Sequence, residues 1–447
     1  MRKNILQAAA ITVFVFGMMW VVSKITDLKL FNAFDPISQA LSDFELTDYA
    51  FSNLRPDPLV DQRIVVVNIG TLNRAGIAQQ ISTISQYKPK AIGLDVYVGC
   101  EGGLRDSINC PALLDTLGNL LLSNAIQEAG NVVIVSELLQ KKQTIMDGKY
   151  DLLDSVQYSD EIFKDYAYNA YANLVTDADY QDDVKLCRSY MPSYQIGDQT
   201  HYAFATQLAM LYDSTLTQKF LNRKKREELI NYRGNIEIQD TRATLDKSKK
   251  TSTTNYPVYF YAVDVDQLAR GEVLGELFTN SIVLLGYLGN YFGHPAWEDK
   301  YFTPLNKKVA GRANPDMFGV VVHANIIAMI LSQDYVDELQ EWQKYSIAII
   351  LCFFTVLLFI YIDEKYPRWF DAASVGIQIL QLILLSLLIM EVYAWSSFKL
   401  DLTITLASTA LVGPCYDVFK SMQNEINFRL TKRRRNALKQ QKEENLA

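Results

Sequence analysis

The sequence predicts an α/β domain with a mostly parallel sheet covered by helices, carried outside the membrane by four transmembrane helices. Short apolar runs alternate with segments of helical spacing between residues 63 and 137. One long apolar stretch precedes this region and three more follow it near the end of the chain. With 447 residues, 49% of them hydrophobic, the composition fits a water-soluble domain attached to a few membrane spans.

The first element is an uncharged stretch from Ile5 to Val22, preceded by Arg2 and Lys3. About 18 apolar residues after a positive start are typical of a signal anchor. A cleaved secretory signal is the alternative, but the stretch is long for one and no small-x-small site follows Trp20. We therefore expect residues 1–25 to stay as a transmembrane anchor.

The exported region opens with alternating strands and helices. Strands are expected at Arg63–Gly70, Lys90–Val98 and Asn131–Glu137, with helices at 75–87 and Pro111–Glu128. The strands are apolar on both faces, which is typical of a parallel sheet covered by helices on both sides.

Further elements continue this pattern after a tyrosine-rich middle section. They are the segment 228–237, a helix at Ala262–Glu272, a strand at Ser281–Gly289 and an apolar helix at Phe318–Leu331. Since no repeat or low-complexity linker interrupts the region, we expect residues 26–342 to form one domain.

Three more spans are expected at Ser346–Ile362, Ala372–Ala394 and Leu402–Phe419. They make residues 343–420 a transmembrane bundle and leave residues 421–447 as a basic tail. With four spans, the N-terminus, the 363–368 loop and the tail share one side. Their Lys and Arg residues predict that this side is cytoplasmic.

Charge and cysteines limit the kind of partner and cofactor. The formal charge of −7 argues against nucleic acid, since such binders need a basic face. Cys100 and Cys110 bracket a short exported loop and are expected to form a disulfide. With no CxxC and no histidine nearby, we expect no metal there. The glycines of "GYLGNYFG" have the wrong spacing for a phosphate cradle, and no cofactor is expected.

His323, in the apolar helix, is the most conspicuous candidate site residue. A lone histidine on an apolar helix usually packs and makes one buried hydrogen bond, and we prefer that interpretation. The alternative is that Asp95, Thr303 and His323 converge on the crevice where open α/β sheets bind ligands. An exported enzyme acting near Asp95 and His323 is a third hypothesis. No Ser or Cys nucleophile stands in a suitable motif, so we expect no enzyme.

Several segments resemble the CHASE2 family of bacterial extracytoplasmic sensory domains. They occur in the family's order and are "FELTDYAFSNL", "RIVVVNIG", "YKPKAIGLDVYV", "GNVVIVSE", "DDVKLCRSYMP", "HYAFATQLAMLY", "NYRG", "SIVLLGYL", "YFTP" and "FGVVVHANIIAMIL". The resemblance covers nearly the whole exported region and extends to the three spans that typically follow. It implies a multi-pass protein of the bacterial inner membrane with its large domain in the periplasm.

The chain also departs from the family. Asn68 stands where the family often has an acidic residue, which adds Asn68 to the candidate ligand-binding residues. Asp183 replaces a glycine, and residues 239–256 read as an extra polar loop. A catalytic output domain usually follows the spans, but the 27 residues after Lys420 are too few for one. We therefore expect a sensory or scaffolding protein that acts through a separate polypeptide.

The basic run Lys432, Arg433, Arg434 and Arg435 fits two roles. Clustered cations beside a span are attracted to anionic lipid, and they also fit a docking site for a protein. The expected partners are therefore membrane lipid, proteins of a membrane complex and a second copy of the chain.

Overall fold

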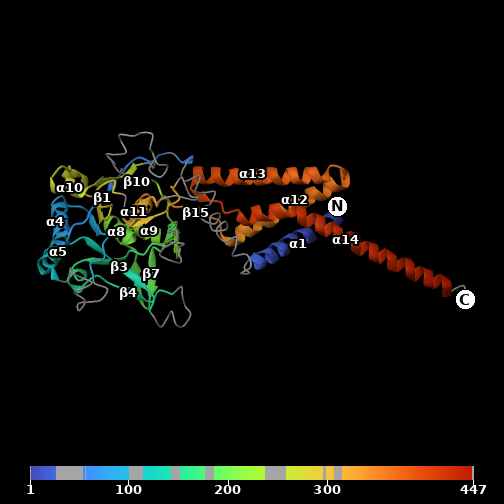
Figure 1. Ribbon diagram of the computed structural model, residues 1–447, viewed down its shortest axis with the longest axis horizontal. Coiled ribbons are helices and arrows are strands. Elements are labelled where there is room, and N and C mark those ends of the chain that lie inside the picture. The colour runs from blue at the N-terminus through green and yellow to red at the C-terminus, as the bar shows by residue number, and fades with distance from the viewer. Residues whose placement is uncertain are drawn as a thin grey trace. The chain divides into compact units, whose positions relative to one another are not determined.

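The computed structural model describes residues 2–26, 54–55, 57–99, 114–141, 152–176, 186–236, 258–294, 298–306 and 315–444. The chain divides into two compact units. The α/β unit is Asp43–Asp337, and the helical unit is Met1–Ser42 with Glu338–Ala447 (Figure 1).

The α/β unit is built on an eight-stranded sheet with the order β10-β11-β1-β12-β2-β3-β4, in which β5 also pairs with β3. All the pairs are parallel except β3 with β4. The strands are β1 (Asp61–Asn68), β2 (Ala91–Leu94), β3 (Val132–Leu139), β4 (Ser155–Gln157), β5 (Tyr168–Tyr171), β10 (Asn235–Ile236), β11 (Val258–Val263) and β12 (Ile282–Gly286). The prediction of a mostly parallel sheet is confirmed.

Helices and short strands complete the two units. The α/β unit holds α4 (Arg74–Ser85), α5 (Thr116–Ala129), α7 (Glu161–Lys164), α8 (Phe204–Tyr212), α9 (Ser214–Leu221), α10 (Val265–Ala269), the 3-10 helix η6 (Gly275–Phe278) and α11 (Gly319–Ser332). Its short strands are β6 (Ser189–Tyr190), β7 (Ser193–Ile196), β8 (Gln199–Tyr202), β9 (Glu228–Leu229), β13 (Lys300–Tyr301) and β14 (Met317–Phe318). The helical unit holds α1 (Arg2–Thr26), α12 (Glu341–Lys365), α13 (Phe370–Ser396), β16 (Phe398–Lys399) and α14 (Thr403–Glu444), and β15 (Asp337–Glu338) lies at the boundary between the units.

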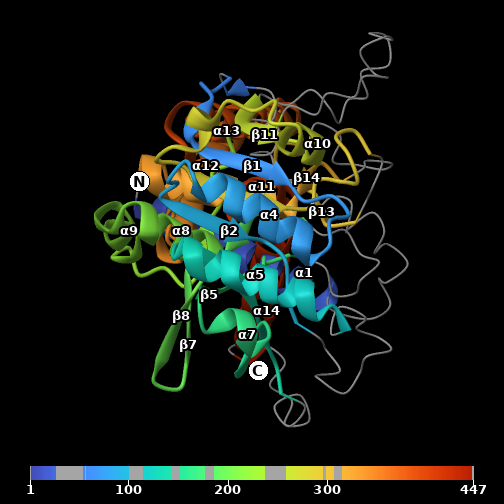
Figure 2. The ribbon, with the colours of Figure 1, turned by 90° about the vertical axis from the view of Figure 1, so that its left-hand side faces the viewer.

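Helices cover both faces of the sheet (Figure 2). On one face, α4 and α5 pack side by side over a core that includes Val65, Val67 and Leu285. On the other face, α8 and α11 lie so close to the strands that glycines are needed beneath them. A Cβ on Gly93 would lie 2.7 Å from Phe204 Cζ, and one on Gly286 would lie 2.6 Å from Val320 Cβ.

Two strand placements differ from what the sequence indicates. β12 follows β2 and β3 in the chain but lies between β1 and β2, so the first two predicted strands are not neighbours. β11 was missed, because its residues 262 and 263 were assigned to a helix. The helix is α10, which begins only after Asp264 caps it.

Three helices of the helical unit are long and apolar enough to cross a membrane, Arg2–Lys24, Glu341–Lys365 and Phe370–Ser396. The fourth predicted span, Leu402–Phe419, forms the first part of the 42-residue α14, which is not among them. Its threonines, Asp417 and Pro414 lower its hydropathy. Three of the four predicted spans are thus helices that are long and apolar enough to cross a membrane.

The contact between Gly286 and Val320 can be tested by substitution. We expect Gly286→Ala to destabilise the α/β unit by about 1 to 3 kcal/mol, because the new methyl group overlaps Val320 and forces α11 away from β12. The free energy of unfolding of the full chain in detergent is the measurement. Val320→Ala makes room, so the double variant should lose less stability than the sum of the two single changes. Strict additivity would contradict the close packing.

Candidate functional site

The carboxyl ends of the central strands carry the candidate site, because ligands of open α/β sheets bind at this edge. Asn68 ends β1 and is fully buried. Its Nδ2 donates to Asp264 Oδ1 at 2.8 Å and to the Gly289 carbonyl at 2.9 Å. Its Oδ1 accepts from the backbone N–H groups of Gly70 and Leu288, both at 2.9 Å. The side-chain amide of Asn68 thus links the three segments that follow β1, β11 and β12.

Asp95 follows β2, and its backbone N–H donates to the Leu285 carbonyl at 2.8 Å. Strand alternation places Asp95 on the same face as Gly93, toward α8 and α11. The residue keeps some solvent exposure. Burial of its carboxylate and the nearby charge of Asp299 raise the pKa of Asp95 well above its ordinary value. Among the described residues, no hydrogen bond to this carboxylate is formed.

Asp299 connects Asp95 to the start of α11. The Asp299 carbonyl accepts from the Gly319 N–H at 2.9 Å, and a Cβ on Gly319 would lie 3.1 Å from Asp299 Oδ1. Tyr301 lies beside Gly319 as well, and burial together with the charges of Asp299 and Asp95 raises the pKa of its hydroxyl. The Asp299 carboxylate therefore lies near the positive end of the α11 dipole.

His323 lies in the second turn of α11 and is only 3% exposed. Its ring meets Phe204 edge to face, with the ring centres 5.2 Å apart. Its Nδ1 has no hydrogen-bond partner among the described residues. Burial lowers the pKa of His323 to about 4, so the imidazole is neutral at pH 7. The side chain packs as its apolar neighbours indicate, without the expected hydrogen bond on Nδ1.

Thr303 stabilises a loop with Asp316. Its hydroxyl donates to Asp316 Oδ2 at 2.6 Å, and its backbone N–H donates to Asp316 Oδ1 at 2.9 Å. Asn306 Nδ2 donates to the same carboxylate at 3.2 Å. Burial outweighs these bonds and raises the pKa of Asp316 to about 7. The polar groups of Thr303 are thus used within its own loop.

The four predicted ligand-binding residues differ in what they offer. In the described part of the chain, no hydrogen bond links any two of Asn68, Asp95, Thr303 and His323. Only Asp95 combines exposure with a carboxylate that no hydrogen bond satisfies there. Asp299 and Tyr301, which the sequence reasoning missed, lie near it. A signal for Tyr301 was present, since this residue opens the segment "YFTP".

The remaining predicted sites lie elsewhere. Cys100 and Cys110, with their predicted disulfide, fall outside the described residues. Lys432, Arg433, Arg434 and Arg435 are exposed on α14.

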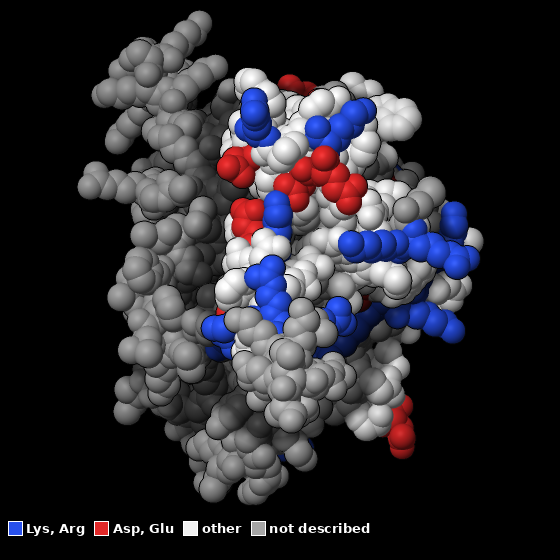
Figure 3. Space-filling view, turned by 90° about the vertical axis from the view of Figure 1, so that its right-hand side faces the viewer, with Lys and Arg blue, Asp and Glu red and all other residues white. Residues whose placement is uncertain are grey.

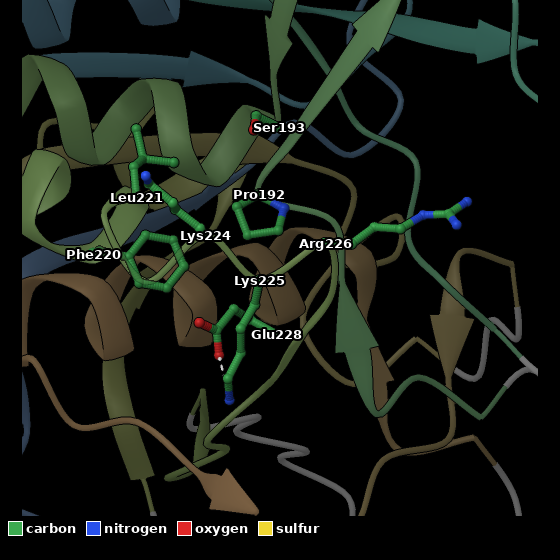
Figure 4. A pocket seen from close by; sticks show the side chains of 8 residues that line it. All are labelled: Pro192, Ser193, Phe220, Leu221, Lys224, Lys225, Arg226 and Glu228. Carbon is green, nitrogen blue, oxygen red and sulfur yellow. Dashed lines mark ion pairs between the residues drawn. The ribbon is translucent and has the colours of Figure 1, made fainter. Parts of the chain in front are cut away.

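A pocket that the sequence did not indicate lies beside α9 (Figure 4). It encloses about 300 Å³ and is lined by Pro192, Ser193, Phe220, Leu221, Lys224, Lys225, Arg226 and Glu228. Glu228 is 2% exposed and pairs with Arg223 at 2.7 Å and Lys225 at 3.5 Å. Arg226 points away from the pocket. The buried Glu228 carboxylate is therefore neutralised by neighbouring cations. The run "RKKREE", which contains these residues, is the sequence signal for this charge cluster.

Comparison with known proteins identifies one family. The family model described as CHASE2 domain matches residues 15–360, well over half of the chain. No curated protein and no solved structure matches the chain.

The buried neutral His323 makes stability depend on pH. The unfolded chain binds a proton at this residue near pH 6.5 and the folded chain only near pH 4, so acid favours unfolding within that range. We expect His323→Leu to remove this effect, which amounts to about 1.4 kcal/mol per pH unit. The free energy of unfolding of the variant should therefore fall less than that of the wild type between pH 7 and pH 4.5. His323→Gln, which cannot titrate but stays polar, should behave alike, and an unchanged slope in both variants would contradict the neutral imidazole.

Proposed function

The chain belongs to the CHASE2 family, and we propose that it is a membrane-anchored sensory protein that recognises a ligand or a protein outside the membrane and acts through a separate partner. CHASE2 domains are extracytoplasmic sensory domains, and three helices of this chain could span a membrane. We further propose that the α/β unit lies in the periplasm of a bacterium, with four spans in the inner membrane and both termini in the cytoplasm.

Two ion pairs, one at each end of α12, are the main support for the proposal of a fourth span. Lys344 of α12 pairs with Asp401 at 2.8 Å, and Asp363 at the other end of α12 pairs with Lys420 at 2.6 Å. The step along the chain is 19 residues in both cases, from Lys344 to Asp363 and from Asp401 to Lys420.

A helix of that length rises by about 29 Å, close to the hydrocarbon thickness of about 30 Å. The first part of α14 therefore extends beside α12 over the same distance, with charged groups at both ends of the two helices. Its buried Thr405, Ser408 and Thr409 face other helices, where small polar residues are favourable in a membrane. Gln378 of α13 donates to the Thr409 carbonyl at 2.8 Å. These contacts explain how a less apolar helix can span.

The N-terminus lies at the same end of the bundle as the Asp363–Lys420 pair. Asn4 donates to the Glu364 carboxylate at 3.1 Å, and Gln7 donates to Gln423 at 3.4 Å. With Arg2, Lys3 and the basic tail, this end is the positive one and supports its assignment to the cytoplasm.

We propose recognition and no chemical conversion in the α/β unit. Asn68 and Thr303 use their polar atoms to hold backbone and neighbouring side chains, and His323 packs against Phe204. A general base must reach the proton that it removes, and these side chains face protein atoms. Asp95 remains as the candidate ligand contact. Because a second carboxylate lies near it, a cation or a hydrogen-bond donor is the chemistry that fits.

Topology can be tested with engineered cysteines. Asp198→Cys, in the exposed turn between β7 and β8, should react in intact cells with a maleimide that cannot cross the membrane. Arg434→Cys, exposed on α14, should react only after the membrane is opened. Serine replaces Cys100 and Cys110 in both strains to remove their background. Three spans would place Arg434 outside, so its labelling in intact cells would reject the fourth span.

Ligand recognition can be tested without knowing the ligand. The full chain in detergent is heated with the low-molecular-weight fraction of the medium in which its host grows. Bound ligand stabilises the folded state by mass action, so the wild type should melt at a higher temperature. We expect Asp95→Asn to lose this shift and Asp198→Asn, a matched change in an exposed turn, to keep it. An equal shift in all three proteins would exclude Asp95 as a ligand contact.

A further inference from the structure

The second part of α14 continues beyond the bundle as a single helix (Figure 1). Its contacts with the other helices end near Gln423, which bonds Gln7 of α1. The helix itself extends to Glu444, about 36 Å past Lys420 at about 1.5 Å per residue. A long helix that packs against nothing is stabilised mainly when a partner covers its apolar face.

An apolar stripe lies on this part of the helix. Met422, Ile426 and Leu430 follow one another at intervals of four residues and are 52%, 56% and 51% exposed. We call these three residues the tail stripe. At helical spacing they continue the face on which Val412 and Cys415 pack in the bundle core. The packing face of α14 thus extends past the ends of the helices that cover it.

Positive charges follow the tail stripe along the helix. Arg429 bonds Glu425 at 2.6 Å, and the four cations at 432–435 have no carboxylate partner among the described side chains. Figure 3 shows Lys and Arg side chains, together with a smaller group of Asp and Glu side chains, on the face seen from the end toward which α14 extends. A second copy of the chain would bring like charges together, which is destabilising. An acidic surface is the complement that fits.

Anionic lipid is a poorer complement because of distance. Lys432 lies about 18 Å along the helix from Lys420, at about 1.5 Å per residue. Attraction to headgroups falls off within a Debye length of about 8 Å at physiological salt. Lipid would also leave the tail stripe exposed, since the helix continues the direction of its span.

We propose that the tail stripe and the cations at 432–435 dock an acidic amphipathic helix of a cytoplasmic protein. This inference rests on the proposed function, since it needs the tail in the cytoplasm and a separate partner. The apolar residues of the partner helix cover Met422, Ile426 and Leu430, and its carboxylates pair with the cations beside them.

Site-specific photocrosslinking in the native host tests the proposal. The photoreactive p-benzoylphenylalanine is placed at Ile426 or Leu430, and, as the matched control, at the exposed Asn424, which helical spacing puts on the opposite side of α14. We expect crosslinks from the first two positions and not from Asn424. Peptide mapping should locate them in a segment with excess Asp and Glu and apolar residues at helical spacing.

Two variants sharpen the result. Ile426→Glu should lower the crosslink yield at Leu430 about tenfold or more, because it removes a buried aliphatic contact, whereas Asn424→Glu on the opposite face should not. Replacing all four cations at 432–435 by glutamine should lower it similarly. Crosslinks to lipid, to a second copy of the chain or to a basic segment, equal crosslinking from both faces, or none at all would overturn the proposal. If a partner still co-purifies with the full chain in those cases, the proposed function stands and only its docking site is wrong.

Discussion

The constraint on which the α/β unit depends is that a parallel sheet has no face to leave in water. β1 and β12 are buried along nearly their whole lengths, and 13 of the 14 residues of α11 are buried as well. Residues 93 and 286 are glycines, and no larger side chain fits there, because helices approach the strands closely on one side of the sheet. Burial on α11 disfavours the charged form of a titratable side chain, and it lowers the pKa of His323 to about 4.

The same constraint keeps polar chemistry off the two faces of the sheet, and much of its carboxyl edge is used to hold the fold together. The Asn68 side chain donates two hydrogen bonds and accepts two, and its partners lie in three different loops. An aspartate there could not donate to Asp264 and would add a second negative charge, which accounts for the amide in this chain. Asp95 differs because no hydrogen bond from a described residue satisfies its carboxylate, which lies near the charge of Asp299.

The sequence was sufficient where periodicity and local burial determine structure. The apolar runs of β1, β3 and β12 and the helices α4 and α11 were predicted close to their observed bounds. Insertion of β12 between β1 and β2 could not be predicted, because strand order depends on long-range pairing and not on local pattern. Of the candidate site, Asp95 was selected because it lies toward the carboxyl end of a predicted parallel strand. Asp299 and Tyr301 were not, since only the folding of the 298–303 loop onto α11 brings them near Asp95.

In the helical unit, the matched ion pairs have a mechanical consequence for a sensor. Only three residues separate Asp337, the last of the α/β unit, from α12 at Glu341. Ion pairs hold both ends of α12, Asp363 with Lys420 of α14 and Lys344 with Asp401, which lies two residues before α14 begins. The two helices therefore move as a pair rather than slide, because sliding would break both ion pairs. Since α14 is one continuous helix to Glu444, tilting or rotation of the pair is carried directly to the tail stripe.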